Sequence, residues 1–236
     1  MSRRWVITGG SRGLGLAAVR AALSHGDRVA VLARQPSASL AAELGAAALV
    51  LPVDVTDPVA LGAACDTVAA AWGGIDVLVN NAGLHRGGRI DKLRLADWDA
   101  VLATNLSGPL HCIRAALPHM SAGAAIVNIG AVVGFRGFPG DSAYGASKSG
   151  LAGLTQVLAA ELAPRGIRVN LVLPGFVLTA MTAGVNEAAH QRLLARIPLG
   201  RMGTEAEIAE VVWWVAGSTY MTGAVIPTDG GMLCQL

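Results

Sequence analysis

Two residues with acid–base side chains, Tyr144 and Lys148, lie four positions apart in the sequence YGASK. Four residues are about one helical turn, so on a helix the two side chains share a face. A phenol titrates near pH ~10, and a nearby ammonium is expected to lower the pKa of Tyr144. Such a pair can give a proton to a carbonyl oxygen or remove one from a hydroxyl. The alternative is a surface Tyr–Lys pair without a chemical role.

The elements that must position this pair are short apolar runs that alternate with longer helical stretches. The runs occupy residues 5–9, 28–33, 47–54, 75–83, 124–130, 167–175 and 224–231. They are rich in Val, Ile and Leu without polar alternation, which is typical of strands covered on both faces. The order predicts an α/β, doubly wound fold, a parallel sheet with helices on both faces. Because no linker interrupts it, we expect one domain over residues 1–236.

Composition narrows the classes of function. The chain has 236 residues, 18 basic and 16 acidic, with no block of like charges, so nucleic acid is not expected as a partner. No apolar run has the length of a membrane span, and the start has no room for a signal peptide, so a cytoplasmic protein is expected. Three dispersed cysteines, Cys65, Cys112 and Cys234, favour reduced thiols over a metal site.

The glycine-rich stretch TGGSRGLG, residues 8–15, follows the first predicted strand and opens a helix. Gly9, Gly13 and Gly15 permit positive φ and close backbone approach. The helix that follows presents free N–H groups and its positive dipole end to a pyrophosphate. A structural turn is the alternative, but the strand–turn–helix context favours a dinucleotide site that also includes Ser11, Arg12 and Leu14.

The residues after the second strand predict which dinucleotide binds. A site for NAD places an acid here, whereas this chain has Ala33 followed by Arg34. Arg34 and Arg12 suit a 2′-phosphate, because a guanidinium binds phosphate bidentately. NADP(H) is therefore the expected cofactor. Asp54, followed by Val55, is a candidate adenine contact or, equally, a helix cap.

Taken together, these motifs resemble the short-chain dehydrogenase/reductase family, especially its 3-oxoacyl-[acyl-carrier-protein] reductase-like branch. The motifs, which cover almost the whole chain, are TGGSRGLG (8–15), NNAG (80–83), the Asn105 region, YGASK (144–148), LPG (173–175) and TGAVIPTDGG (222–231). The resemblance implies a Rossmann-like domain with a seven-stranded parallel sheet. It also implies hydride transfer with a nicotinamide cofactor, usually in a homotetramer.

The resemblance assigns roles to individual residues. Asn105, Tyr144 and Lys148 match the family's catalytic residues, with the Asn anchoring a water beside the Lys. Asn105 lies in a predicted helix whose core would not need an amide, although a satisfied buried Asn is the alternative. The remaining matched positions, expected to contact the cofactor, are Asn81, Ala82, Gly83, Pro174, Gly175, Val177 and Thr179.

One position departs from the family pattern. Ala131 stands where the family usually has a Ser, thirteen residues before the Tyr. Losing one such donor typically lowers turnover by about 10²–10³. Ser142 is too close to Tyr144 along a helix to replace it. Two explanations stay open: an engineered Ser→Ala substitution, favoured because the other groups are intact, or a weak, specialised or non-catalytic relative.

The substrate is the least determined part. The irregular segment 176–203 is expected to act as a lid at the carboxyl ends of the strands. An apolar pocket, or plain packing, is expected from Leu84, His85, Phe135, Phe138, Met181 and Val185. The first hypothesis is an NADPH-dependent ketoreductase acting on a 3-oxoacyl thioester, with an acyl carrier protein as a possible partner. The alternatives are a reductase or dehydrogenase of a small or polyketide-derived ketone or alcohol, and a non-catalytic NADP-binding sensor or scaffold.

Overall fold

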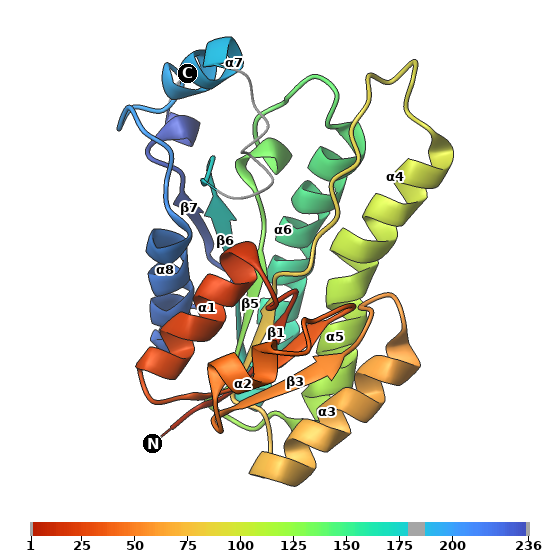
Figure 1. Cartoon of the computed structure of the whole chain (residues 1–236), viewed down its shortest axis with the longest axis vertical. Helices are drawn as coiled ribbons and strands as arrows, with labels where there is room; N and C mark the ends of the chain where they lie inside the picture. Colours follow the sequence, from red (N-terminus) through yellow and green to blue (C-terminus); the bar gives the residue numbers. More distant parts are fainter. Residues whose placement is uncertain (1, 179–186, 235–236) are drawn as a thin grey trace.

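The computed structural model describes residues 2–178 and 187–234, with the backbone alone in residues 187–190. Seven parallel strands form one sheet in the order β3-β2-β1-β4-β5-β6-β7 (Figure 1). The strands are β1 (Arg4–Thr8), β2 (Arg28–Ala33), β3 (Ala48–Pro52), β4 (Val77–Asn80), β5 (Ala125–Ile129), β6 (Arg168–Pro174) and β7 (Val225–Thr228). Each predicted apolar run contains one strand, so the predicted doubly wound fold is confirmed.

Helices cover both faces of the sheet. They are α1 (Gly13–Ser24), α2 (Leu40–Leu44), α3 (Pro58–Trp72), α4 (Leu95–Leu102), α5 (Gly108–Ala116), α6 (Ser142–Leu162), α7 (Glu187–Leu194) and α8 (Glu205–Gly217). Alternate residues of β1 serve two cores, because successive strand side chains point to opposite faces. Ile7 packs in one core with side chains of α1 and α8, and Val6 packs in the other with side chains of α3 and α5.

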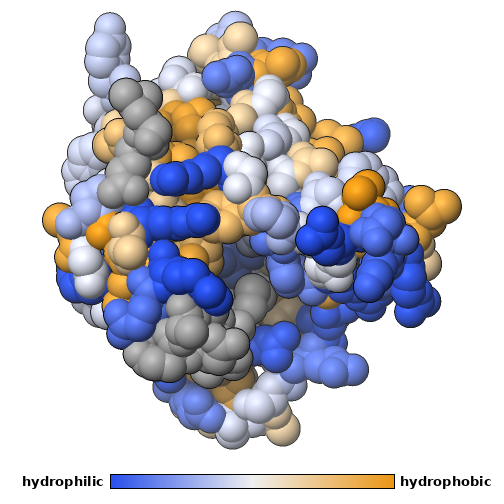
Figure 2. All heavy atoms as spheres, turned by 90° about the horizontal axis from the view of Figure 1, so that it is seen from above, coloured by the Kyte–Doolittle hydropathy of each residue, from blue (hydrophilic) through white to orange (hydrophobic). Residues whose placement is uncertain are grey.

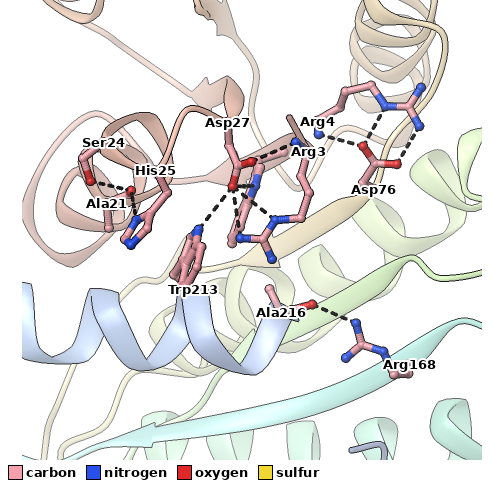
Figure 3. A network of polar contacts seen from close by, with 11 residues as sticks. Arg3, Arg4, Ala21, Ser24, His25, Asp27, Asp76, Arg168, Trp213 and Ala216 are labelled. Atoms are coloured by element: carbon pink, nitrogen blue, oxygen red, sulfur yellow. Dashed lines mark hydrogen bonds and ion pairs between the residues drawn. The ribbon is translucent and has the colours of Figure 1, made fainter. Parts of the chain in front are cut away.

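A buried polar network closes the end of the sheet where β1 and β2 begin (Figure 3). The carboxylate of Asp27 accepts hydrogen bonds from Arg3 N at 2.8 Å, Trp5 Nε1 at 2.9 Å and Trp213 Nε1 at 3.2 Å. His25 stacks on Trp213 with ring centroids 3.8 Å apart. These contacts join the amino-terminal segment, the start of β2 and α8. The glycine-rich turn lies at the opposite end of the sheet, where β1 ends.

Two sequence expectations concern the chain as a whole. None of the helices in the described residues is long and apolar enough to cross a membrane. Cys65 and Cys112 are buried and Cys234 is exposed, and all three thiols are free.

Candidate active site

The glycine-rich turn is bonded directly to the end of β4. Thr8 Oγ1 accepts hydrogen bonds from the amides of Asn81 and Ala82, both at 3.0 Å, and donates to Val79 O at 3.3 Å. Asn81 Nδ2 donates to Thr8 O at 3.0 Å and to Gly9 O at 3.3 Å. The turn after β1 and the segment after β4 therefore form one rigid unit.

The glycines of the turn are required by space and backbone conformation. Gly9 and Gly13 have φ of +66° and +58°, values that side chains disfavour. A methyl group built on Gly9 would lie 2.9 Å from Ala82 Cα, and one on Gly15 would overlap Gly9 O and Asn81 Nδ2. Side chains at Gly9 and Gly15 would therefore push the turn away from the segment after β4.

The first turn of α1 is open to an anion. Arg12 precedes the helix in an extended conformation, with φ −161°, and no side chain caps the helix. The first N–H groups of a helix have no intrahelical partner, so they can bind phosphate oxygens beside the positive dipole end. This uncapped turn and the glycine cradle fit the pyrophosphate of a dinucleotide.

Both predicted phosphate-binding arginines are free for a ligand. Arg12 and Arg34 are exposed, and within the described part of the chain neither guanidinium has a hydrogen bond or an ion pair. Arg34 follows β2 directly, and Arg12 lies in the turn after β1. Because β1 and β2 pair in parallel, the two arginines lie at the same end of the sheet, after the carboxyl ends of these strands.

The structure limits what Asp54 does. Its Oδ1 accepts hydrogen bonds from Thr56 N at 2.9 Å and Thr56 Oγ1 at 2.8 Å. The side chain that caps α3 is Asp57, which accepts from Val59 N and Ala60 N. The capping interpretation of Asp54 is therefore wrong, and its second oxygen is left for a contact. Val55 is buried, and a methyl group on Gly108 would lie 2.8 Å from its Cγ2.

Tyr144 and Lys148 lie on one face of α6, as their spacing predicts. Lys148 is only 4% exposed, and its Nζ donates to Ile129 O, the last carbonyl of β5, at 2.7 Å. The same Nζ lies 5.6 Å from the centroid of the Tyr144 ring. The lysine thus joins the end of β5 to the helix that carries the tyrosine.

The sequence predicts a lowered pKa for Tyr144, and the groups of the protein itself raise that pKa instead. Burial, with the negative charge of Asp141 as a second cause, raises the pKa of Tyr144 to about 12. Burial lowers the pKa of Lys148 to about 8. The ammonium is desolvated and bonded to a carbonyl rather than to the phenol, so its effect on the phenolate does not outweigh burial.

Asn105 lies in a π-helical turn, Ala103–Ser107, between α4 and α5. Its Oδ1 accepts from Leu84 N at 2.7 Å, and its Nδ2 donates to Leu84 O at 2.9 Å and to Ser147 Oγ at 3.1 Å. The side chain is therefore a satisfied buried amide that fixes the segment after β4 against α6. A methyl group on Gly83 would lie 3.7 Å from Asn105 Oδ1 and 3.9 Å from Lys148 Nζ, so the two residues meet at Gly83.

Ala131 follows β5 in extended backbone, with φ −164°, and precedes a 3₁₀ turn, Val132–Gly134. Its methyl group offers no hydrogen bond. Ser142 does not compensate, because it is exposed at the first position of α6 and lines a hollow away from the Tyr144 face. Residue 131 therefore offers no hydroxyl to a ligand at this end of β5.

Pro174 ends β6, and Gly175 packs closely against β7. A methyl group on Gly175 would lie 2.7 Å from Asp229 Cα. Val177 is buried and pairs with Gly203, which closes the base of the segment 176–203. This segment is less irregular than expected, because it contains α7. Thr179, Met181 and Val185 lie outside the described residues.

The described residues of the predicted apolar pocket lie in different surroundings. Phe138 packs edge-on against Phe176 at 5.6 Å between centroids, whereas Phe135 is 46% exposed. The hollow, about 450 Å³, is lined by Arg89, Ile90, Val133, Gly137, Phe138, Pro139, Gly140, Asp141, Ser142, Gly145 and Ala146. Among the predicted residues that the structure describes, only Phe138 lines it. Residues 142, 145 and 146 lie on a different face of α6 from Tyr144 and Lys148, so this hollow is beside the reactive groups rather than at them.

Leu84 and His85, which belong to the same predicted set, lie in the segment after β4, and His85 contacts Tyr144. Leu84 is held by Asn105, and the His85 ring lies edge-on to the Tyr144 ring with centroids 5.1 Å apart. His85 Nε2 is 2.7 Å from Asp141 Oδ1, and this hydrogen bond raises the pKa of His85 above its usual value despite partial burial. Figure 2 views this end of the molecule, where hydrophilic and hydrophobic groups both lie around a hollowed centre.

Sequence reasoning missed three polar residues of the site: Thr8, Asp141 and Ser147. Thr8 begins the glycine-rich stretch, and Asp141 directly precedes the helix of Tyr144, so both positions carried a signal. Ser147 donates to Tyr144 O at 2.7 Å while it accepts from Asn105. Its small hydroxyl side chain inside YGASK carried no such signal.

Known proteins share this arrangement over the whole chain. The family described as "Enoyl-(Acyl carrier protein) reductase" matches residues 9–233. A carbonyl reductase family member 4 of Danio rerio is 43% identical over an alignment of 236 positions, which covers 98% of this chain and 98% of that protein. The chain belongs to the short-chain dehydrogenase/reductase family.

Two further relatives bear on substrate and cofactor. A 3-oxoacyl-[acyl-carrier-protein] reductase of Staphylococcus aureus (strain Mu50) is 36% identical over 242 residues, with 98% of each chain covered. A blue fluorescent protein from a metagenomic library, solved in complex with NADPH, has a TM-score of 0.90 and 35% identity. The match covers 98% of this chain and 97% of that one.

Substitution of Gly15 tests the role of the phosphate turn. Gly15→Ala should weaken NADPH binding by at least about tenfold, because the added methyl group overlaps Gly9 O and displaces the turn. Fluorescence titration of NADPH measures the dissociation constant. Gly62→Ala is the matched control, since a methyl group at this helical glycine meets nothing within 4 Å. Equal affinities for the two variants would contradict a site at the turn.

Proposed function

We propose that this protein is an NADPH-dependent ketoreductase that reduces the keto group of a 3-oxoacyl thioester. The observation that carries the proposal is the buried Lys148 beside Tyr144, at the carboxyl end of β5 and next to the phosphate turn. The similarity to carbonyl and 3-oxoacyl reductases supports this reaction class. The thioester carrier is coenzyme A or an acyl carrier protein.

The cofactor would supply the hydride, and the chain would hold it at three places. The pyrophosphate would lie against Gly13–Gly15 at the start of α1. Arg12 and Arg34 would bind the 2′-phosphate, since both are exposed without protein partners in the described chain. The remaining contacts would come from Asn81–Gly83, Asp54, Val55 and the segment that begins at Pro174.

Tyr144 would donate its proton to the carbonyl oxygen as negative charge develops there. A pKa of about 12 keeps the phenol protonated at neutral pH, which suits the reductive direction. Lys148, with a pKa of about 8, is mostly charged at pH 7 and would stabilise the phenolate that remains. Asn105 would act as a positioning residue, because it fixes Leu84 against the helix of Tyr144.

Ala131 favours a second candidate function, a non-catalytic NADP-binding sensor or scaffold. The methyl group at this position donates no hydrogen bond to a carbonyl oxygen, and a sensor or scaffold would need no turnover. A reductase of small ketones is the same chemistry on another substrate, so the substrate panel must include small ketones and both kinds of thioester.

We also propose a homotetramer. Leu110 on α5 and Val157 on α6 are 39% and 56% exposed, and apolar side chains on these helices suit a partner subunit better than water. Light scattering at micromolar concentration should give four times the mass of the chain. A monomer under these conditions would rule this assembly out.

Cofactor preference follows from the two free arginines. NADPH should bind at least about tenfold tighter than NADH, a difference of ~1.4 kcal/mol, and Arg34→Asp should narrow or reverse the preference. Titration of both nucleotides measures it. Arg28→Asp is the matched control, because Arg28 is exposed at the other end of β2 and makes the same change in charge. The assignment fails if the parent protein binds both nucleotides equally.

The test of the reaction is Ala131→Ser. A hydroxyl here would bind the carbonyl oxygen most strongly as it becomes charged, so kcat should rise by about 10²-fold, or ~2.7 kcal/mol, with little change in NADPH affinity. Adding Tyr144→Phe should then remove nearly all activity. NADPH absorbance with the ketone panel gives both rates. NADPH binding without turnover in either background would favour the scaffold.

A further inference from the structure

We propose that His85 is a further catalytic residue of this site, whose Nδ1–H donates a hydrogen bond to the substrate's carbonyl oxygen beside Tyr144. The inference rests on the proposed ketoreductase function. It gives the carbonyl oxygen a second donor in a site where residue 131 offers only a methyl group.

His85 lies beside Tyr144. The residue follows directly on Asn81–Gly83, and its ring lies edge-on to the ring of Tyr144, with centroids 5.1 Å apart and planes at 74°. Its backbone neighbour Leu84 is fixed by Asn105, so the ring is delivered to the tyrosine by a rigid segment. The imidazole therefore borders the aromatic ring whose hydroxyl would meet the substrate oxygen.

The hydrogen bond to Asp141 determines which nitrogen of His85 faces a ligand. Nε2 lies 2.7 Å from Asp141 Oδ1, and a carboxylate accepts only, so Nε2 carries a hydrogen. Within the described residues Nδ1 has no protein partner, which leaves it for a ligand. Neutral imidazole would present a lone pair at Nδ1, whereas imidazolium presents N–H. The donor therefore exists only when His85 is protonated.

The charges around the ring favour that protonated form. Asp141 contacts the imidazole from the start of α6, and Tyr144 faces it as a neutral phenol with Lys148 on the same helix face. In its own loop, Arg86 is paired with Asp97 at 2.8 Å, and Arg89 lines the neighbouring hollow with Asp141. Asp141 raises the pKa of His85, so its donor is present at lower pH and is lost as pH rises through that raised value.

A purely structural pair is the competing explanation. The side chains of His85 and Asp141 are 39% and 25% exposed, and ion pairs this accessible add little stability. The chain has a second His–Asp pair for comparison, in which His119 Nε2 lies 2.9 Å from Asp66 Oδ1. His119 O accepts a hydrogen bond from Ile75 N just before β4, so this pair lies at the other end of the sheet. A structural role would make the two histidines equivalent in their effect on turnover.

The experiment compares His85→Phe with His119→Phe, in the parent chain and in the Ala131→Ser background. His85→Phe keeps an aromatic ring against Tyr144 but removes both nitrogens. It should lower kcat at pH 6 by about tenfold or more, with NADPH affinity unchanged, and should remove the decline of kcat that the parent shows with rising pH. His119→Phe should change neither. Lys148 and Tyr144 titrate in every variant, so the difference between profiles reports His85.

Two further variants sharpen the result. His85→Gln carries an uncharged amide donor and should keep part of the activity without the pH dependence, and Asp141→Asn should move the decline to lower pH. Ala131→Ser should raise kcat more in His85→Phe than in the parent, because the two donors serve the same oxygen. Turnover with an unaltered rate and pH profile in His85→Phe would overturn the role of His85 alone. Absence of turnover in both the parent and Ala131→Ser would overturn the proposed function and this role with it.

Discussion

The hydroxyl of Thr8 fixes the relation between the two halves of the candidate site. It is 1% exposed and binds Val79 O and the amides of Asn81 and Ala82. These three bonds pair two backbone amides and one carbonyl where the parallel strands β1 and β4 end side by side. The turn expected to hold the phosphates and the segment that leads to the reactive groups are therefore a single body, and neither can move without the other.

A series of hydrogen bonds between uncharged groups connects the end of β4 to Tyr144. The segment after β4 reaches Leu84, whose N–H and C=O are both bound by Asn105; Asn105 binds Ser147, and Ser147 binds Tyr144 O. Uncharged groups suit a buried position because their desolvation is offset by a single good partner each. Lys148 is the exception within the described core of the site, and its position is set by one carbonyl of β5.

The sheet and the reactive pair could be predicted from the sequence because they rest on local patterns. Apolar runs predict buried parallel strands, and the spacing of Tyr144 and Lys148 predicts a shared helix face. The pKa of Tyr144 could not be predicted, since it depends on burial by the whole fold and on Asp141. The partners of Asn105 and the separation of Phe135 from Phe138 likewise depend on how distant segments pack. The stretch from Ala131 to Tyr144 carries no information about His85, which follows a different strand, β4.

Burial of Lys148 also lowers the stability of the folded protein at neutral pH. Its pKa is lowered to about 8 by desolvation alone, so folding disfavours the ammonium at neutral pH, a cost that fades as the solution is taken from pH 8 towards the ordinary lysine value. An apolar residue of similar length would relieve that cost while abolishing the charge beside Tyr144. Selection for heat resistance alone would therefore tend to remove this charge, and the melting temperature would not report the charge beside Tyr144.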